Sequence, residues 1–272
     1  HSAFPYDVLK ASNFAHPAPL ARKTPPPPAP RIQTEFVDFG LMMGTYGSCP
    51  LTRWVESSFG AEALDLVHQR FALGVLEDEA NPSWPWTVHW HIDEQGRIHT
   101  AKLMRYVTTR GRSRRLKKEH LGGEFVQSIQ WIHKLIDNPP EPWTQTLYGL
   151  QQLHQKPRES VAIVEGYKTA IVCSIAFPDR IWLGADSIHT LTSYGEECPL
   201  LTPLRGRDIY LVPDLGKGAE VWREALSKLH KAGHRASIDT RFEKAARVRG
   251  MEDGDLEDFV FEYIYKKQAA EV

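Results

Sequence analysis

Two carboxylates follow short apolar runs that are typical of buried strands. Glu165 comes directly after "VAIV" and before Gly166, and Asp214 ends "YLVPD". Because the carboxyl ends of parallel strands lie at one edge of a sheet, neighbouring strands would bring both side chains together. Carboxylate oxygens suit Mg²⁺, which takes one or two protein carboxylates and keeps several waters and substrate phosphates. The structural alternative places Glu165 beside a helix N-cap and Asp214 in a turn.

Further candidates come from neighbouring segments. Asp186 follows another apolar run at "LGAD", while Asp255 and Asp258 belong to "DGDLEDFV" and could instead form an exposed acidic patch. Lys168, in "EGYKTA", would lie in the first turn of a helix, where free backbone N–H groups favour a phosphate. A lysine there is otherwise simply solvated. The expected ligands of Mg²⁺ or Mn²⁺ are Glu165, Asp214, Asp186 and Asp255, and the expected catalytic residues are Glu165, Asp214 and Lys168.

The elements that must position these residues alternate between strand and helix from Ser160 onward. Apolar strands are expected in "SVAIVE", "RIWLGA", "RDIYLVPD" and "RASID", and helices in "KTAIVCSIA" and "GAEVWREALSKLHKAG". Short β-branched runs that alternate with helices predict an α/β fold with a parallel sheet flanked by helices. This sheet is expected within a domain that spans residues 158–272.

A smaller α+β region is expected over residues 34–157. Its apolar spacing predicts two short helices broken near Gly60, a β-hairpin around "DEQG", and a short amphipathic helix from Phe125 to Leu135. Residues 1–33 contain "KTPPPPAPR", which predicts an extended arm or linker, or alternatively a proline-rich peptide ligand.

A dense basic run provides the expected nucleic-acid contacts. "TRGRSRRLKKEH" is almost free of apolar residues, and arginine and lysine neutralise phosphates and release their counterions. The alternative is a solvated loop. Trp90 or Tyr106 could stack on bases, or could belong to the core. The expected contacts are Lys102, Arg105, Arg110, Arg112, Arg114, Arg115, Lys117 and Lys118.

Composition limits the class of protein. The chain has 272 residues, a formal net charge of −1 and three cysteines without a CxxC pair. Neither a disulfide framework nor a zinc knuckle is therefore expected, and His89, His91 and His99 alternate on the hairpin without a further ligand at defined spacing. No apolar run approaches the length of a membrane span, so we expect a cytoplasmic protein without a membrane partner.

The motifs resemble those of a known family. "VAIVEGYKTAIV", "DRIWLGADS" and "GRDIYLVPDLGKGAEVWREAL" are similar to a Toprim domain, the catalytic module of bacterial primases, topoisomerases and some nucleases. The order of features over about residues 50–262 resembles an uncharacterised primase-like Toprim family of bacterial mobile elements. The resemblance implies a Mg²⁺-dependent replication protein that acts on single-stranded DNA or RNA, and it admits other replication proteins as partners. It also implies that Glu165 is a general acid/base or metal-organising residue and that Asp214 binds metal.

One departure from the Toprim pattern affects the expected activity. Gly216 stands where a catalytic Toprim domain has its second aspartate, two residues after Asp214. Since fewer carboxylates hold a divalent ion more weakly, metal affinity should fall. The sequence therefore leaves three functions open: a primase-like enzyme, a catalytically degenerate module that binds or docks on nucleic acid, and a nuclease.

Overall fold

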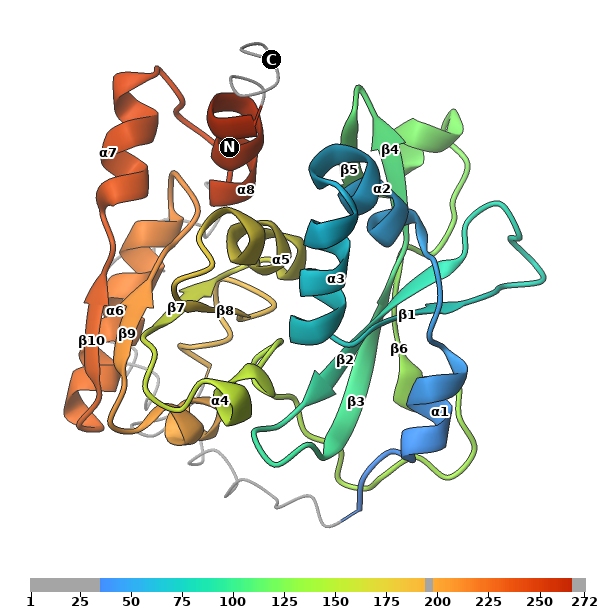
Figure 1. Ribbon diagram of the computed structural model, residues 1–272, viewed down its shortest axis with the longest axis horizontal. Coiled ribbons are helices and arrows are strands. Elements are labelled where there is room, and N and C mark those ends of the chain that lie inside the picture. Colours follow the sequence, from blue (N-terminus) through green and yellow to red (C-terminus); the bar gives the residue numbers. More distant parts are fainter. Residues whose placement is uncertain (1–34, 194–197, 266–272) are drawn as a thin grey trace, which may run out of the picture.

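The computed structural model describes residues 35–193 and 198–265, and the expected proline-rich arm of residues 1–33 lies outside them. Two four-stranded sheets lie beside each other, the parallel sheet on the left of Figure 1 and the antiparallel sheet on the right. No helix among the described residues is long and apolar enough to cross a membrane.

The parallel sheet confirms the expected α/β fold class. Its strand order is β10 (Arg235–Ile238), β9 (Asp208–Leu211), β7 (Val161–Val164) and β8 (Ile181–Gly184), with every pair parallel. All four residues of β7 are buried, because Ala162 and Val164 face one apolar cluster while Val161 and Ile163 face another. The flanking helices are α5 (Tyr167–Ala176), α6 (Gly218–Lys231), α7 (Arg241–Val248) and α8 (Leu256–Val260). Since β7 is an inner strand, Glu165 has neighbouring strands on both sides.

The antiparallel sheet has the order β1 (Leu73–Leu76), β2 (Trp86–Ile92), β3 (Ile98–Met104) and β6 (Ile129–Trp131). The hairpin of β2 and β3 confirms the one expected around "DEQG". A two-stranded ribbon of β4 (Tyr106–Thr109) and β5 (Arg112–Arg115) continues from β3. Its turn has positive φ at Arg110 and Gly111, as a two-residue hairpin turn requires. Most of the predicted solvated basic loop is therefore a regular ribbon.

The prediction of a helix from Phe125 to Leu135 is wrong. Ile129–Trp131 instead form the edge strand β6, which pairs with Lys102–Met104 of β3, and a short 3₁₀ helix, η2 (Ile132–Lys134), follows. Phe125 is 75% exposed, so it does not continue an apolar helix face. Residues Ile129 and Trp131 also fit the two-residue period of a strand, and pairing with β3 decides between the two patterns.

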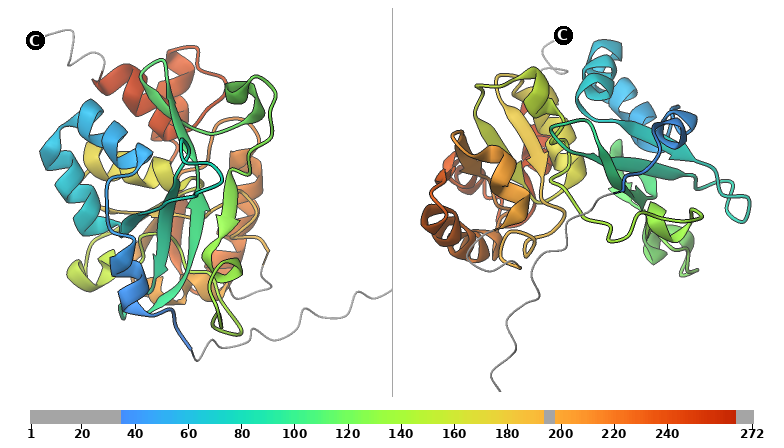
Figure 2. Two further views of the ribbon diagram at one scale, coloured as in Figure 1. Left: turned by 90° about the vertical axis from the view of Figure 1, so that its right-hand side faces the viewer. Right: turned by 90° about the horizontal axis from the view of Figure 1, so that it is seen from below.

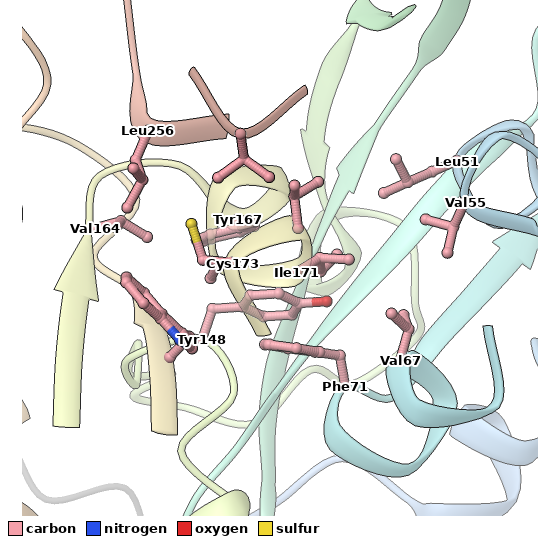
Figure 3. Packing of buried hydrophobic residues seen from close by; sticks show 14 of the residues in the cluster. Leu51, Val55, Val67, Phe71, Tyr148, Val164, Tyr167, Ile171, Cys173 and Leu256 are labelled. Atoms are coloured by element: carbon pink, nitrogen blue, oxygen red, sulfur yellow. The ribbon is translucent and has the colours of Figure 1, made fainter. Parts of the chain in front are cut away.

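Helices α2 (Pro50–Phe59) and α3 (Ala61–Arg70) confirm the two expected around Gly60. They pack against α5, which lies between the two sheets (Figures 2 and 3). Tyr167 and Ile171 of α5 share one buried cluster with Val67 and Phe71. The remaining short elements are α1 (Phe39–Gly44), α4 (Gln152–Gln155), η1 (Lys118–Leu121), η3 (Pro199–Leu204) and the π-helical turn η4 (Phe261–Tyr265). The shared core fixes the position of the antiparallel sheet against the carboxyl edge of β7 and β8.

Candidate functional site

Glu165 lies at the carboxyl end of β7, against the start of α6. A Cβ atom added to Gly218, the first residue of α6, would lie 3.0 Å from Glu165 Oε1, so glycine leaves room for the carboxylate there. This oxygen is buried and has no hydrogen-bond partner among the described residues. Burial raises the pKa of Glu165, and nearby Asp255 adds to the rise. A buried oxygen without a donor is suited to a cation.

Asp214 lies on the loop after β9, and a backbone hydrogen bond joins this loop to the segment before α8. The backbone N–H of Leu215 donates to the carbonyl of Gly254 at 2.9 Å. This bond holds Asp214 near Asp255, whose Oδ2 accepts from Thr169 Oγ1 of α5 at 2.9 Å. Glu165 and Asp255 lie close enough to Asp214 for their charges to raise its pKa, and we call these three acids the edge carboxylates.

The edge carboxylates repel one another. The pKa of Asp214 is raised to about 8, first by burial and then by the charges of Glu165, Asp255, Asp258 and Asp253 in that order. The pKa of Asp255 is also raised, first by burial. Within residues 35–193 and 198–265, no lysine or arginine forms an ion pair with any of the three edge carboxylates. Three carboxylates held together without a side-chain cation favour either protons or a divalent ion.

Two further acids of α8 have a different environment. Glu257 is fully buried, and its carboxylate lies 2.8 Å from Lys168 Nζ and 3.0 Å from Arg112. Asp258 lies 2.5 Å from Arg112 and 3.0 Å from Arg114. We call these two acids and three cations the α8 clamp. Although Asp255, Glu257 and Asp258 are close enough to share a metal ion, cations already neutralise the last two.

The clamp changes the interpretation of Lys168. Its ammonium group also donates to the carbonyl of Ser113 at 2.6 Å, so it binds the ribbon and α8 together. A lysine with these partners joins two parts of the molecule and forms no ion pair with the edge carboxylates among the described residues. The described contacts of Lys168 are structural, and its catalytic role stays a prediction.

Asp186 lies at the same edge but is already paired. Its carboxylate accepts from Lys102 Nζ of β3, while its backbone N–H donates to the carbonyl of Glu165 at 2.9 Å. Lys102 also lies 5.3 Å from the ring centre of Tyr167, whose hydroxyl is 2.9 Å from His91 Nε2. This network joins the antiparallel sheet to the acidic edge. It leaves Asp186 with a counterion that the edge carboxylates lack.

Several predicted contact residues occupy unexpected places. Arg105 is 1% exposed, pairs with Asp78, and lies 3.9 Å from the ring centre of Trp86, so its predicted contact with nucleic acid is wrong. Trp90 and Tyr106 are also buried, which excludes base stacking. The basic residues that remain exposed are Arg110, Arg115, Lys117 and Lys118.

The histidines of the hairpin are core residues. His89 Nε2 lies 3.1 Å from the hydroxyl of Tyr106, and His91 Nδ1 lies 2.9 Å from the carbonyl of Thr146. Burial lowers the pKa of His91 to about 4 and that of His89 well below its ordinary value, so both rings are neutral. The structure provides no metal site at this pair.

Gly216 is exposed and has a φ of 83°. This is a left-handed conformation that an L-residue adopts with strain, although Asp and Asn tolerate it better than most. The loop is therefore shaped around glycine where the Toprim pattern has an aspartate.

The functional residue that the sequence analysis missed is Glu257. Its partner Arg112 is 145 residues away in the chain, and nothing in "DLEDF" indicates a buried glutamate. The charge pattern of the sequence could have indicated this pairing, because the basic run needs acidic partners and "DGDLED" is a dense acidic segment.

Comparison with known proteins gives a family but no activity. The family model described as Domain of unknown function (DUF6371) matches residues 50–215. No curated protein matches the chain.

Solved structures of bacterial primases are weakly similar. The Escherichia coli primase catalytic core is 12% identical with a TM-score of 0.47, over 84% of this chain and 82% of that one. The DnaG primase catalytic domain bound to ssDNA is 13% identical with a TM-score of 0.47, over 85% and 75%. The zinc-binding and RNA polymerase domains of the Aquifex aeolicus primase are 13% identical with a TM-score of 0.42, and the match spans 81% of this chain and 58% of that chain. Values this low establish neither the activity nor the substrate of the chain.

Proposed function

Because this chain belongs to the family described as Domain of unknown function (DUF6371), which names no activity, we propose its function from the edge carboxylates. We propose a Toprim-type, primase-like protein that binds Mg²⁺ or Mn²⁺ at this edge and acts on nucleic acid. The sequence resemblance also favours a replication protein of a mobile element.

The buried Oε1 of Glu165, which lacks a donor among the described residues, is the observation that carries this proposal. Burial and the charges of Glu165 and Asp255 raise the pKa of neighbouring Asp214 to about 8, so without an ion this group keeps a proton at neutral pH. Hard oxygen ligands of this kind fit Mg²⁺ or Mn²⁺. When bound, such an ion neutralises negative charge that develops on a transferred phosphoryl group.

The residues have distinct roles in this proposal. Asp214 and Asp255 hold the ion, and Glu165 either shares it or accepts a proton from the attacking hydroxyl, since burial raises its pKa toward the working range of a general base. Asp186 instead orients Lys102. The exposed basic residues Arg110, Arg115, Lys117 and Lys118 supply phosphate contacts to the strand.

Gly216 supports a second candidate, a module that binds nucleic acid without catalysis. Fewer carboxylates reach the edge than a full Toprim pattern provides, so the ion would be held more weakly. A nuclease would use the same edge, because cleavage and synthesis of a phosphodiester both need charge neutralised at phosphorus.

The test is an extension assay with a single-stranded template, nucleotides and Mg²⁺ or Mn²⁺. We expect the wild type to form products, and Glu165→Gln and Asp214→Asn to lose at least about a hundredfold of the rate. Matched controls are Glu224→Gln on α6 and Asp208→Asn, whose carboxylates are exposed, and Asp208 begins β9 whereas Asp214 follows its other end.

Three outcomes separate the candidates. Synthesis that depends on Glu165 and Asp214 supports the primase-like function. Cleavage of the template without nucleotides, with the same dependence, supports the nuclease. Binding without any chemistry, unchanged in both variants, leaves the binding module and contradicts an enzyme.

A further inference from the structure

Three aromatic rings lie close together at the end of the edge strand of the antiparallel sheet. Trp131 ends β6, His133 lies in η2, and Trp143 follows on the next loop. The ring centres of His133 and Trp143 are 4.0 Å apart with planes 20° apart, and the ring centre of Trp131 lies 5.9 Å from that of His133 and 5.5 Å from that of Trp143. His133 and Trp143 are therefore stacked, and Trp131 packs beside both. We call these three rings the aromatic cluster.

The aromatic cluster does not belong to the core. Neither tryptophan is part of the three buried apolar clusters of the described residues, and Trp143 is 38% exposed. Burial and neighbouring Lys134 lower the pKa of His133, so a neutral flat ring stacks on Trp143. A large aromatic ring that is stacked on one side and exposed to solvent leaves room for one more flat ring.

The aromatic cluster is connected to the edge carboxylates. Lys102 pairs with Trp131 across β3 and β6, and its ammonium group lies 5.8 Å from the ring centre of Trp131. The same group contacts Asp186, whose backbone N–H donates to the carbonyl of Glu165. Lys102 and Asp186 therefore connect Trp131 to the acidic edge.

Basic residues lie at the other end of β6. The backbone N–H of Leu116 donates to the carbonyl of Arg105, and the N–H of Arg105 donates to the carbonyl of Ser128. Arg105 therefore connects the end of the ribbon to the start of β6. Lys118 Nζ lies 5.7 Å from the ring centre of Phe125, which is 75% exposed. Among the residues described, Arg115 and Lys118 form no ion pair. The half-buried edge strand β6 is therefore a path with cations near its start and aromatic rings at its end.

We propose that this path binds a single-stranded nucleic acid, with an unpaired base stacked on Trp143 and the phosphates held by Arg115, Lys117 and Lys118. Basic residues combined with exposed aromatic rings bind single strands without sequence preference, because every base has a flat face. A duplex hides these faces within its own stack. The proposal rests on the proposed function and adds to it the residues that bind an unpaired strand, with Trp143 as the stacking site for a base.

The test compares two labelled strands of equal length by fluorescence anisotropy: oligothymidylate, and an abasic strand that keeps the phosphates and lacks the bases. Trp143→Ala should weaken binding of oligothymidylate about tenfold, the loss expected for one stacked base. Binding of the abasic strand should not change. Trp143→Phe should recover most of the lost affinity, and Phe39→Ala, which truncates a ring that is 62% exposed on α1, is the control for a surface aromatic.

The remaining outcomes distinguish the two proposals. If Trp143→Ala leaves oligothymidylate binding unchanged, or weakens both strands equally, base stacking is wrong. If Arg115→Glu with Lys118→Glu still weakens both strands in that case, binding of nucleic acid stands without stacking. If the wild-type protein binds neither strand, the proposed function fails together with this inference.

Discussion

The edge carboxylates and the α8 clamp contain the same residue types but have opposite electrostatic environments. In the clamp, Glu257 and Asp258 are matched by Arg112, Arg114 and Lys168. At the edge, burial raises the pKa of Glu165, Asp214 and Asp255, the charges of Glu165 and Asp255 add to the rise at Asp214, and none of the three forms an ion pair with a lysine or arginine among the described residues. The presence of counterions, and not the type of acid, therefore distinguishes a structural acidic group from a candidate metal site. Removing a charge should therefore have opposite effects on stability in the two groups.

The largest effect is expected in the clamp. Glu257→Gln leaves Arg112 and Lys168 without their buried partner, and breaking a buried ion pair typically costs about 3 kcal/mol in the free energy of unfolding. Chemical denaturation measures this loss. Glu243→Gln, which weakens an exposed pair with Arg247, should change stability by less than about 0.5 kcal/mol. A loss for Glu257→Gln no larger than that of this control would remove the distinction between the two groups.

At the edge carboxylates, removing a charge should increase the free energy of unfolding instead of lowering it. Asp214→Asn, measured at pH 9 without divalent ions, should raise the free energy of unfolding by about 2 kcal/mol, because it removes one of several charges that repel one another. The native pKa of Asp214, about 8, lies above its value in the unfolded chain, so the native state binds the extra proton between about pH 4 and pH 8. Wild-type stability should therefore fall as pH rises through this window, and the variant should lose that part of the slope.

The matched control for this pH series is Asp208→Asn, because the carboxylate of Asp208 is 58% exposed and paired with Arg235. It should keep the wild-type slope. A lower stability of Asp214→Asn at pH 9 would contradict the repulsion inferred at the edge.

A smaller effect is expected at Gly216. Gly216→Ala should cost about 1 kcal/mol of stability, since its φ of 83° strains any residue with a Cβ. Gly216→Asp should show a similar or smaller cost and should bind Mn²⁺ about fivefold more tightly, because it adds a carboxylate near the edge. Calorimetric titration of both variants separates strain from charge. Equal Mn²⁺ affinities of the two would show that position 216 does not reach the ion.

The smallest effect is expected at Arg114. Its side chain is 43% exposed and shares Asp258 with Arg112, so Arg114→Ala should lower the free energy of unfolding by only about 0.5 kcal/mol. Thermal or chemical denaturation measures the change. A loss as large as that of Glu257→Gln would place the centre of the clamp at Asp258.

The sequence predicted the parallel sheet and its edge because both depend on local patterns. Short β-branched runs locate β7, β8, β9 and β10, and the parallel direction alone brings Glu165 and Asp214 to one side. The clamp could not be predicted, since Arg112 and Glu257 come from distant segments that only the folded chain brings together. Pairing of β6 with β3 also overrode an apolar spacing that fits a helix. Local periodicity therefore predicts where the edge of the sheet lies. Long-range contacts, which the sequence does not show, determine which of the nearby carboxylates have a counterion.

The most direct test of the metal proposal is calorimetric titration of Mn²⁺ or Mg²⁺ into the wild-type protein and into Glu165→Gln, Asp214→Asn and Asp258→Asn. We expect one ion to bind the wild type, at least tenfold weaker binding in the first two variants, and nearly unchanged binding in Asp258→Asn. Failure of the wild type to bind, or loss of binding in Asp258→Asn while Asp214→Asn binds normally, would contradict a metal site at the edge carboxylates.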